Sequence, residues 1–247
     1  MRKEREGDMA ENKVLQDGLK INVVWTIDKF KGNLTEEQRK VYLAGKLQPY
    51  KKVVFRGNLG LNEGINELLK LITGVGSPTA WNAANARIGV GDSDVAEAAT
   101  QTGLQAVSSR TAWTPSTAKV LGDFVRPTSI TDANVFVYEC TVAGTTGTTE
   151  PTWPVVEGQT VVDGTVTWTC RRRKTFKGMM ADYPKVENQT AYFRSEYLND
   201  EAVYTWKEFT IVNAADDTGK NLDRKVSDQG TKPNTETWIV TGQITPY

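Results

Sequence analysis

The stretch that decides the fold runs from residue 55 to residue 103, FRGNLGLNEGINELLKLITGVGSPTAWNAANARIGVGDSDVAEAATQTG. Within it, four apolar residues recur at the i, i+3, i+4 and i+7 spacing of one helix face: Ile65, Leu68, Leu69 and Ile72. Asn62 is a suitable N-cap, and Gly74 can end the helix in the left-handed conformation. We therefore predict a helix over residues 62–73 whose apolar stripe lies across a sheet.

Strand patterns lie on both sides of this helix. Before it, residues 21–27 alternate in the way that is typical of a half-buried strand, and residues 51–56 form a second strand. After it, residues 86–90 form a strand that ends in an acidic turn. Between the first two strands, Thr35 and Gln38 have the spacing of a capping box, which predicts a short surface helix.

The composition changes in the middle of the chain. From about residue 107 to residue 176, helix signals nearly vanish and Thr, Val, Gly and Pro dominate, with strand patterns at 134–142 and 165–171. The first composition then resumes, with strand patterns that include 190–197 and 237–245. We expect a mainly β fold, in which a β-sandwich base with one short α-helix is interrupted by an inserted all-β module. The predicted parts are an N-terminal arm (1–19), the base (20–106 plus 177–247) and the module (107–176).

Composition excludes several classes of function. The chain has no histidine, which removes Ser-His-Asp and Cys-His catalysis and the commonest acid or base at neutral pH. Its 30 basic and 30 acidic side chains balance, so the total charge favours neither nucleic acid nor an acidic membrane. No apolar run is long enough to cross a bilayer, and residues 1–13 lack the apolar core of a signal peptide. We expect a non-enzymatic protein without a cofactor.

Two cysteines and three acidic residues are candidates for redox or metal chemistry, but we expect both sets to have structural roles. Cys140 and Cys170 are expected in the core of the module, where they can pair if their strands are neighbours, although a cytosolic product usually keeps them reduced. Asp92, Asp94 and Glu97 offer oxygen ligands, but their spacing does not match a calcium-binding loop. We therefore predict a self-capping acidic turn and no metal site.

Two tryptophans near prolines are candidate contact residues. Trp153 lies between Pro151 and Pro154, and Trp113 precedes Pro115. Either ring can act as an exposed platform on which a sugar or a partner side chain stacks. The alternative is that Trp153 fills the module's own small core, because a module of this size needs every large apolar side chain that it has. The sequence leaves both interpretations open.

The chain has one basic run, which consists of Arg171, Arg172, Arg173 and Lys174. Such a run can contact phosphate or an acidic neighbouring subunit, which makes it a candidate assembly contact. The alternative is a solvated end of a strand. Because a short basic run in a neutral chain is a weak motif, nucleic acid is not an expected partner.

Several segments, taken in order, resemble a known family. They are GNLGLNEGINELLKLITG, NAANARIGVGDSDVAEAATQTGLQA, YPKVENQTAYFRSEY and WKEFTIVNA, followed by NLDRKVSDQGTK and a closing Thr/Trp strand. Their order is similar to that in a family of tailed-bacteriophage virion structural proteins and covers about residues 20–106 and 177–247. In that family KGM and YP follow closely after GLQA, whereas here residues 107–176 lie between them. This inserted segment is similar to a small β module that recurs in phage tail and capsid-associated proteins.

The resemblance implies a passive component of a virion that is assembled in the host cytoplasm. It carries over no catalytic residues. We expect a head decoration or minor capsid protein that binds the major capsid protein, recurs as a homo-oligomer in the particle and displays the module outward. The alternatives are a tail or tail-fibre-associated protein, and a glycan-binding module that attaches the particle to a host through Trp113 and Trp153.

Overall fold

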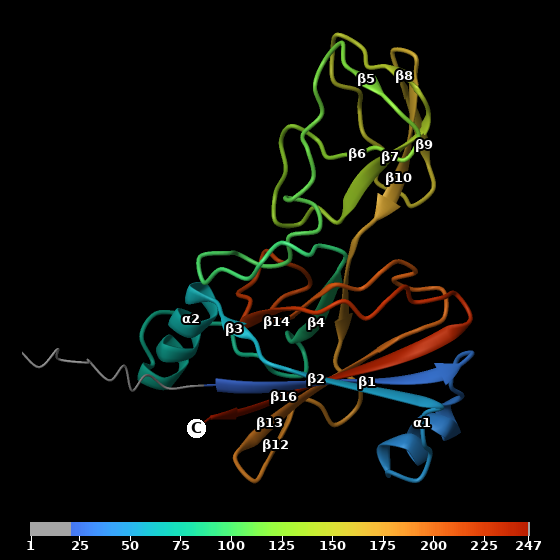
Figure 1. Ribbon diagram of the computed structural model, residues 1–247. Helices are drawn as coiled ribbons and strands as arrows, with labels where there is room; N and C mark the ends of the chain where they lie inside the picture. Colours follow the sequence, from blue (N-terminus) through green and yellow to red (C-terminus); the bar gives the residue numbers. More distant parts are fainter. Residues whose placement is uncertain (1–20, 247) are drawn as a thin grey trace, which may run out of the picture.

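The computed structural model describes residues 21–246, so the predicted N-terminal arm lies outside the described residues. The described chain is mainly β, with several antiparallel sheets and two helices (Figure 1). The prediction of a mainly β fold is therefore confirmed. The helices are α1 (Glu36–Leu43) and α2 (Asn62–Thr73). Neither helix is long and apolar enough to cross a membrane, and the same holds for every helix in the described part of the chain.

Two five-stranded antiparallel sheets form the base of the protein. The first has the strand order β12 (Lys185–Glu187), β13 (Thr190–Tyr197), β16 (Glu236–Pro246), β1 (Ile21–Lys31), β2 (Lys51–Arg56). The second has the order β11 (Lys174–Gly178), β4 (Arg87–Gly91), β14 (Glu208–Val212), β15 (Asp223–Val226), β3 (Leu59–Gly60). Each sheet therefore combines strands from before and after the middle of the chain.

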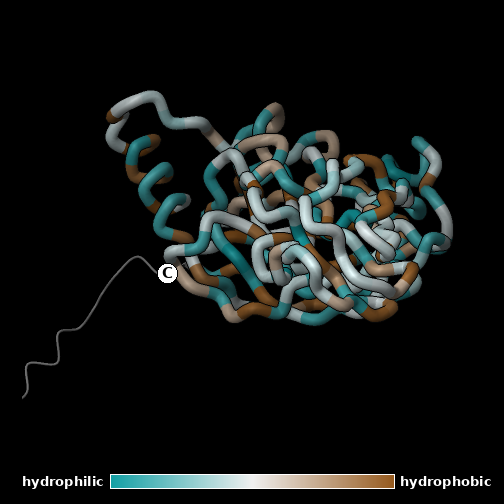
Figure 2. Tube along the Cα trace, turned by 90° about the horizontal axis from the view of Figure 1, so that it is seen from above, coloured by the Kyte–Doolittle hydropathy of each residue, from teal (hydrophilic) through white to brown (hydrophobic). Residues whose placement is uncertain are grey.

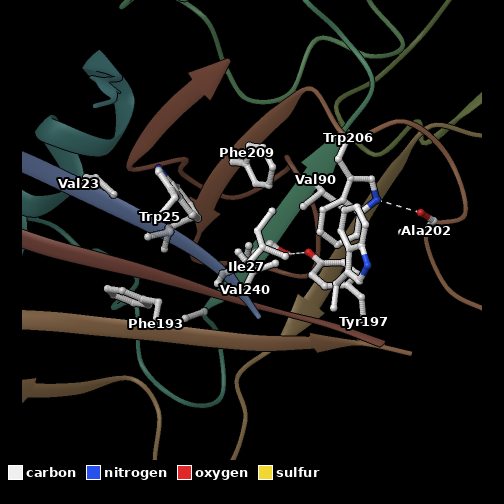
Figure 3. Packing of buried hydrophobic residues seen from close by; sticks show 14 of the residues in the cluster. Val23, Trp25, Ile27, Val90, Phe193, Tyr197, Ala202, Trp206, Phe209 and Val240 are labelled. Atoms are coloured by element: carbon white, nitrogen blue, oxygen red, sulfur yellow. Dashed lines mark hydrogen bonds between the residues drawn. The ribbon is translucent and has the colours of Figure 1, made fainter. Parts of the chain in front are cut away.

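The two sheets enclose one hydrophobic core (Figure 3). Three odd-numbered residues of β1 are fully buried in it, as the alternation predicts: Val23, Trp25 and Ile27. Phe209 of β14 reaches the same core from the opposite sheet and lies 5.6 Å from the Trp25 ring. Trp206 makes edge contacts with Tyr197 at 4.7 Å and Trp238 at 4.8 Å. These large rings fill the space between the sheets, which leaves the base with a packed interior.

The middle of the chain forms a separate β body beside the base, at the top of Figure 1. Its larger sheet has the order β6 (Phe124–Val125), β7 (Phe136–Val142), β10 (Val166–Arg172), β9 (Thr160–Asp163). A smaller sheet pairs β5 (Ala118–Lys119) with β8 (Gly144–Thr145). We call this body the module. It has its own cluster of buried apolar residues.

The module ends earlier than the composition suggests. β11 pairs with β4 of the base, from Lys174 opposite Gly91 to Gly178 opposite Arg87. The boundary after residue 176 is therefore corrected to one after Arg173. The physical reason is that Thr, Phe and Lys fit strands of either body, so composition cannot assign them.

Both cysteines lie in the core of the module and are free thiols. They occupy neighbouring strands, with Cys140 opposite Trp168 and Cys170 opposite Tyr138. Burial raises the pKa of the Cys170 thiol to about 11. Both side chains therefore act as small apolar core residues.

Two of the three predicted helix ends are confirmed. Thr35 and Gln38 form the predicted capping box at the start of α1, and Ala44 ends that helix. Gly74 ends α2 in the left-handed conformation, with φ of 68°. The prediction that Asn62 caps α2 is wrong, because Leu61 occupies the N-cap position and makes no side-chain cap bond.

The prediction that the apolar stripe of α2 lies across a sheet is also wrong. The buried residues of the helix are Gly64 and Glu67. A Cβ atom on Gly64 would lie 2.3 Å from the carbonyl oxygen of Asn221, so the helix backbone sits directly against the chain before β15. Glu67 accepts a hydrogen bond from the Thr79 N–H at 2.6 Å. These two contacts turn much of the stripe outward, and the exposed fractions are 39% for Ile65, 51% for Leu69 and 70% for Ile72.

We predict that Gly64→Ala destabilises the protein by about 3 kcal/mol, because the added methyl group overlaps the 221–222 backbone. In an ordinary helix interior the same change stabilises by about 1 kcal/mol. Urea unfolding measures the difference. Asn66→Ala, on the exposed side of the same helix, is the control and should stay within about 0.5 kcal/mol of wild type. Equal stability of Gly64→Ala and wild type would contradict the close packing of Gly64 against the 221–222 backbone.

Candidate functional site

The basic run does not form the solvent-facing patch that its sequence suggests. Arg171 Nε donates to Glu139 Oε2 at 2.6 Å, and the Arg172 guanidinium lies 4.7 Å from the centre of the Phe136 ring. Both contacts stay inside the module. Arg173 and Lys174 also form ion pairs within the chain, with Asp92 and Asp217. The interpretation of the run as an assembly contact is therefore corrected.

Asp92 connects the module to the base at both of its ends. Its Oδ2 lies 2.8 Å from Arg110 Nη2 and 3.2 Å from Arg173 Nε. Arg110 belongs to the segment that leads into the module, and Arg173 to the segment that leaves it. Burial raises the pKa of Asp92, and the two guanidinium groups oppose that rise. The Asp92 carboxylate, directly after β4, therefore holds together the segment that enters the module and the segment that leaves it.

A second ion pair lies deeper at the same place. Lys174 Nζ donates to Asp217 Oδ2 at 2.7 Å, and both side chains are buried. The same ammonium group donates to the carbonyl oxygen of Asp132, in the module, at 3.2 Å. Asp217 also accepts from the Leu104 N–H, at 3.3 Å. Removing either Lys174 or Asp217 would leave the other charge buried and unpaired, which would strongly destabilise the folded protein.

Glu208 anchors the segment that leads into the module. Arg224 donates to its Oε2 twice, at 2.9 and 2.7 Å, and the N–H groups of Gln105 and Ala106 donate at 2.8 Å each. Burial raises the pKa of Glu208, and Arg224 opposes the rise. A Cβ atom on Gly91 would lie 2.3 Å from Glu208 Oε1, so a glycine is required there. We call Asp92, Asp217, Glu208 and their partners the junction.

The junction predicts where a protease can cut. In Asp92→Asn the side chain keeps its shape but loses the charge that holds Arg110 and Arg173. We expect trypsin to cleave after these two arginines roughly tenfold faster than in wild type, which corresponds to opening that is easier by about 1.4 kcal/mol. Mass spectrometry should detect the released fragment 111–173.

The matched control for this experiment is Glu139→Gln, which removes the ion pair of Arg171 inside the module. It should leave cleavage at Arg110 unchanged. Equal cleavage rates for Asp92→Asn and wild type would show that the junction does not fix the module.

Trp113 is 6% exposed, so its interpretation as an exposed platform is corrected. Its Nε1 donates to Asp163 Oδ2 at 2.7 Å, and Trp168 Nε1 donates to the same oxygen at 2.9 Å. The Gly147 N–H donates to the other carboxylate oxygen at 2.7 Å. The sequence shows Asp163 only as a turn residue before Gly164. The missed signal is an acidic residue within a module that is rich in tryptophan.

Trp153 is half-buried and closes the core of the module from one side. Its ring stacks on Tyr138, with centroids 4.2 Å apart and an interplanar angle of 29°. Its Nε1 donates to Glu150 Oε1 at 2.7 Å. The edge of the ring contacts Trp168 at 6.1 Å. These contacts favour the core-filling interpretation of Trp153 and leave only part of the ring for a ligand.

The carboxylates of the acidic turn each have separate partners. Asp94 pairs with Lys207 at 3.0 Å, while Glu97 accepts from the Val226 N–H at 2.6 Å. Asp92 serves the junction. Among residues 21–246 there is no group of three or more side chains that could hold a metal ion.

The exposed side of α2 borders an apolar groove that the sequence does not reveal. The groove has a volume of about 370 Å³. Leu68 and Leu71 of α2, Val186 of β12, and Phe193 and Ile244 of the first sheet line it. Figure 2 shows hydrophobic residues recurring along this helix at the margin of the molecule, near the C-terminal end. We call this feature the α2 groove.

Asp223 is a buried carboxyl group with an incomplete set of partners. Its Oδ1 accepts from the Ile211 N–H at 3.2 Å, and its Oδ2 has no hydrogen-bond partner. Burial raises the pKa of Asp223 from 3.8 to about 7. The folded protein therefore keeps a proton between about pH 4 and pH 7 that the unfolded chain releases.

It follows that this group stabilises the fold at about pH 4 and that the contribution is lost as the pH rises through about 7. We predict that Asp223→Asn, a neutral group of the same shape, removes this loss, which amounts to at most about 4 kcal/mol. Urea unfolding at pH 4.5 and 7.5 measures it. Asp216→Asn, at a partly exposed turn, should keep the wild-type dependence. An unchanged pH dependence in Asp223→Asn would contradict the assignment.

Comparison of this chain with protein-family models, with curated protein sequences and with solved structures gives no match. A functional conclusion therefore depends on the residues, on their geometry and on the resemblance described for the sequence.

Proposed function

We propose that this chain is a non-enzymatic structural protein of a tailed-bacteriophage particle, with head decoration as the first assignment. The base docks on the particle, and the module is displayed outward. Its partners in this assignment are the major capsid protein and further copies of itself in the particle. A tail or tail-fibre-associated location is the second assignment.

The observation that carries the proposal is the attachment of the module at the junction. Asp92 holds Arg110 and Arg173 together, and the buried pair of Lys174 and Asp217 lies beside them. A flexible linker needs no such buried charges. A body whose orientation is fixed in this way suits display from a docked base, where many identical copies multiply weak contacts by avidity.

A second observation supports a passive role. The buried titratable groups serve packing: Glu208 and Asp217 hold backbone N–H groups and cations of the junction, and Asp223 bonds to a strand N–H. Each is enclosed within the base. Their shifted pKa values follow from burial rather than from an open cleft.

Labelling intact particles tests the location. An antibody against the module, viewed with gold by electron microscopy, should decorate the head shell at regular spacing. Label on tails alone would replace the first assignment by the second. Absence of the protein from purified particles would overturn both.

A glycan-binding role is the alternative for the module, and Trp153 is the residue on which it depends. The ring is half-buried, and the side chains of Val155 and Val156, two and three positions further along the chain, are exposed. A glycan array should then give a signal that Trp153→Ala abolishes and Val155→Ala retains, with folding checked by circular dichroism. Absence of any signal that depends on Trp153 would leave display without glycan recognition.

A further inference from the structure

The α2 groove lies where the described chain begins. Ile21, the first residue of β1, pairs with Pro246, and Val23 pairs with Ile244. Ile244 is one of the residues that line the groove. The start of β1 and α2 also lie on the same side of the base (Figure 1). The polypeptide therefore enters its first strand beside the groove.

The apolar surface around this point is uncovered within residues 21–246. Val186 is 75% exposed and Ile72 is 70% exposed. Leu68 and Leu71 border the same groove, so the apolar arc of α2 continues from the groove to the outer side of the helix. A contiguous apolar surface of this kind marks a contact site.

The sequence before β1 continues the pattern of its buried face. Val23, Trp25 and Ile27 are odd-numbered, and Leu19 and Leu15 fall on the same alternation. Asp17 is the one polar residue in this series. Six residues of extended chain span about 20 Å, and the twelve-residue helix α2 is about 18 Å long. Leu19 and Leu15 are thus within reach of the groove along its length.

We propose that residues 14–19 of this same chain occupy the α2 groove, with Leu19 and Leu15 against Leu68 and Leu71. The segment is attached at Ile21, so its effective concentration at the groove is high and no second molecule has to be captured. This favours the chain's own segment over a second copy. Covering the groove shields apolar surface at this end of the base from water and stabilises the packing of α2 against the base.

Disulfide trapping tests the contact directly. In the full chain, Leu19→Cys combined with Leu71→Cys should form an intrachain disulfide under mild oxidation, detected by mass spectrometry on a monomeric band. Cys140 and Cys170 remain in place because they are buried. The control pairs Leu19→Cys with Val162→Cys, an exposed position in the module, and should form none.

The trapping result overturns the proposal in either of two cases. No disulfide between positions 19 and 71 means that the segment does not visit the groove. A disulfide found only between two chains means that the occupant comes from a second copy.

A matched pair of charge variants provides a second measurement. Leu15→Asp should lower the melting temperature by about 4 °C, the shift expected when one apolar side chain loses its burial in a protein of this size. It should also raise the fluorescence of a hydrophobic dye roughly twofold, since apolar surface is uncovered. Gln16→Asp, on the other alternation, should change neither. Equal behaviour of the two variants would contradict the placement of Leu15.

Discussion

The antiparallel pairing of β1 with β16 is the constraint on which the rest of the structure depends. Eleven residue pairs join the strands, from Ile21 opposite Pro246 to Lys31 opposite Glu236. This pairing lies inside the first sheet, between β13 and β2, and places Trp25 and Val240 in the same core. The chain leaves this sheet after β2 and returns to it at β12, and it leaves again after β13 and returns at β16. The second sheet is built from these two connections, and the module lies within the first of them.

The junction, where the chain leaves the base and re-enters it, is rich in buried charge. The chain leaves the base after Ala106 and returns at Lys174, and both crossings pass the end of β4. Backbone N–H groups there need acceptors, which Glu208 supplies to Gln105 and Ala106. Its charge is in turn balanced by Arg224. Ion pairs of this kind add little net stability over apolar packing, but they define one orientation at the cost of burying charge.

Local patterns in the sequence predicted most of the longer strands but little of the candidate sites. Alternation located β1, and the capping box at Thr35 located α1, because both signals depend only on near neighbours. The outward stripe of α2 was missed, because its seat depends on the close approach of Gly64 to Asn221. Trp113 and the run 171–174 were misread, since Asp163, Asp92 and Asp217 partner them from distant positions.

The sequence by itself determined the mainly β class and the alternation of β1, because each follows from period, composition and turn chemistry along the chain. Only the tertiary structure decided which polar groups meet. The partners of Asp92 lie eighteen or more positions away, and no local rule selects them. The face that α2 presents outward was also decided there, since a glycine contact overrode the hydrophobic pattern.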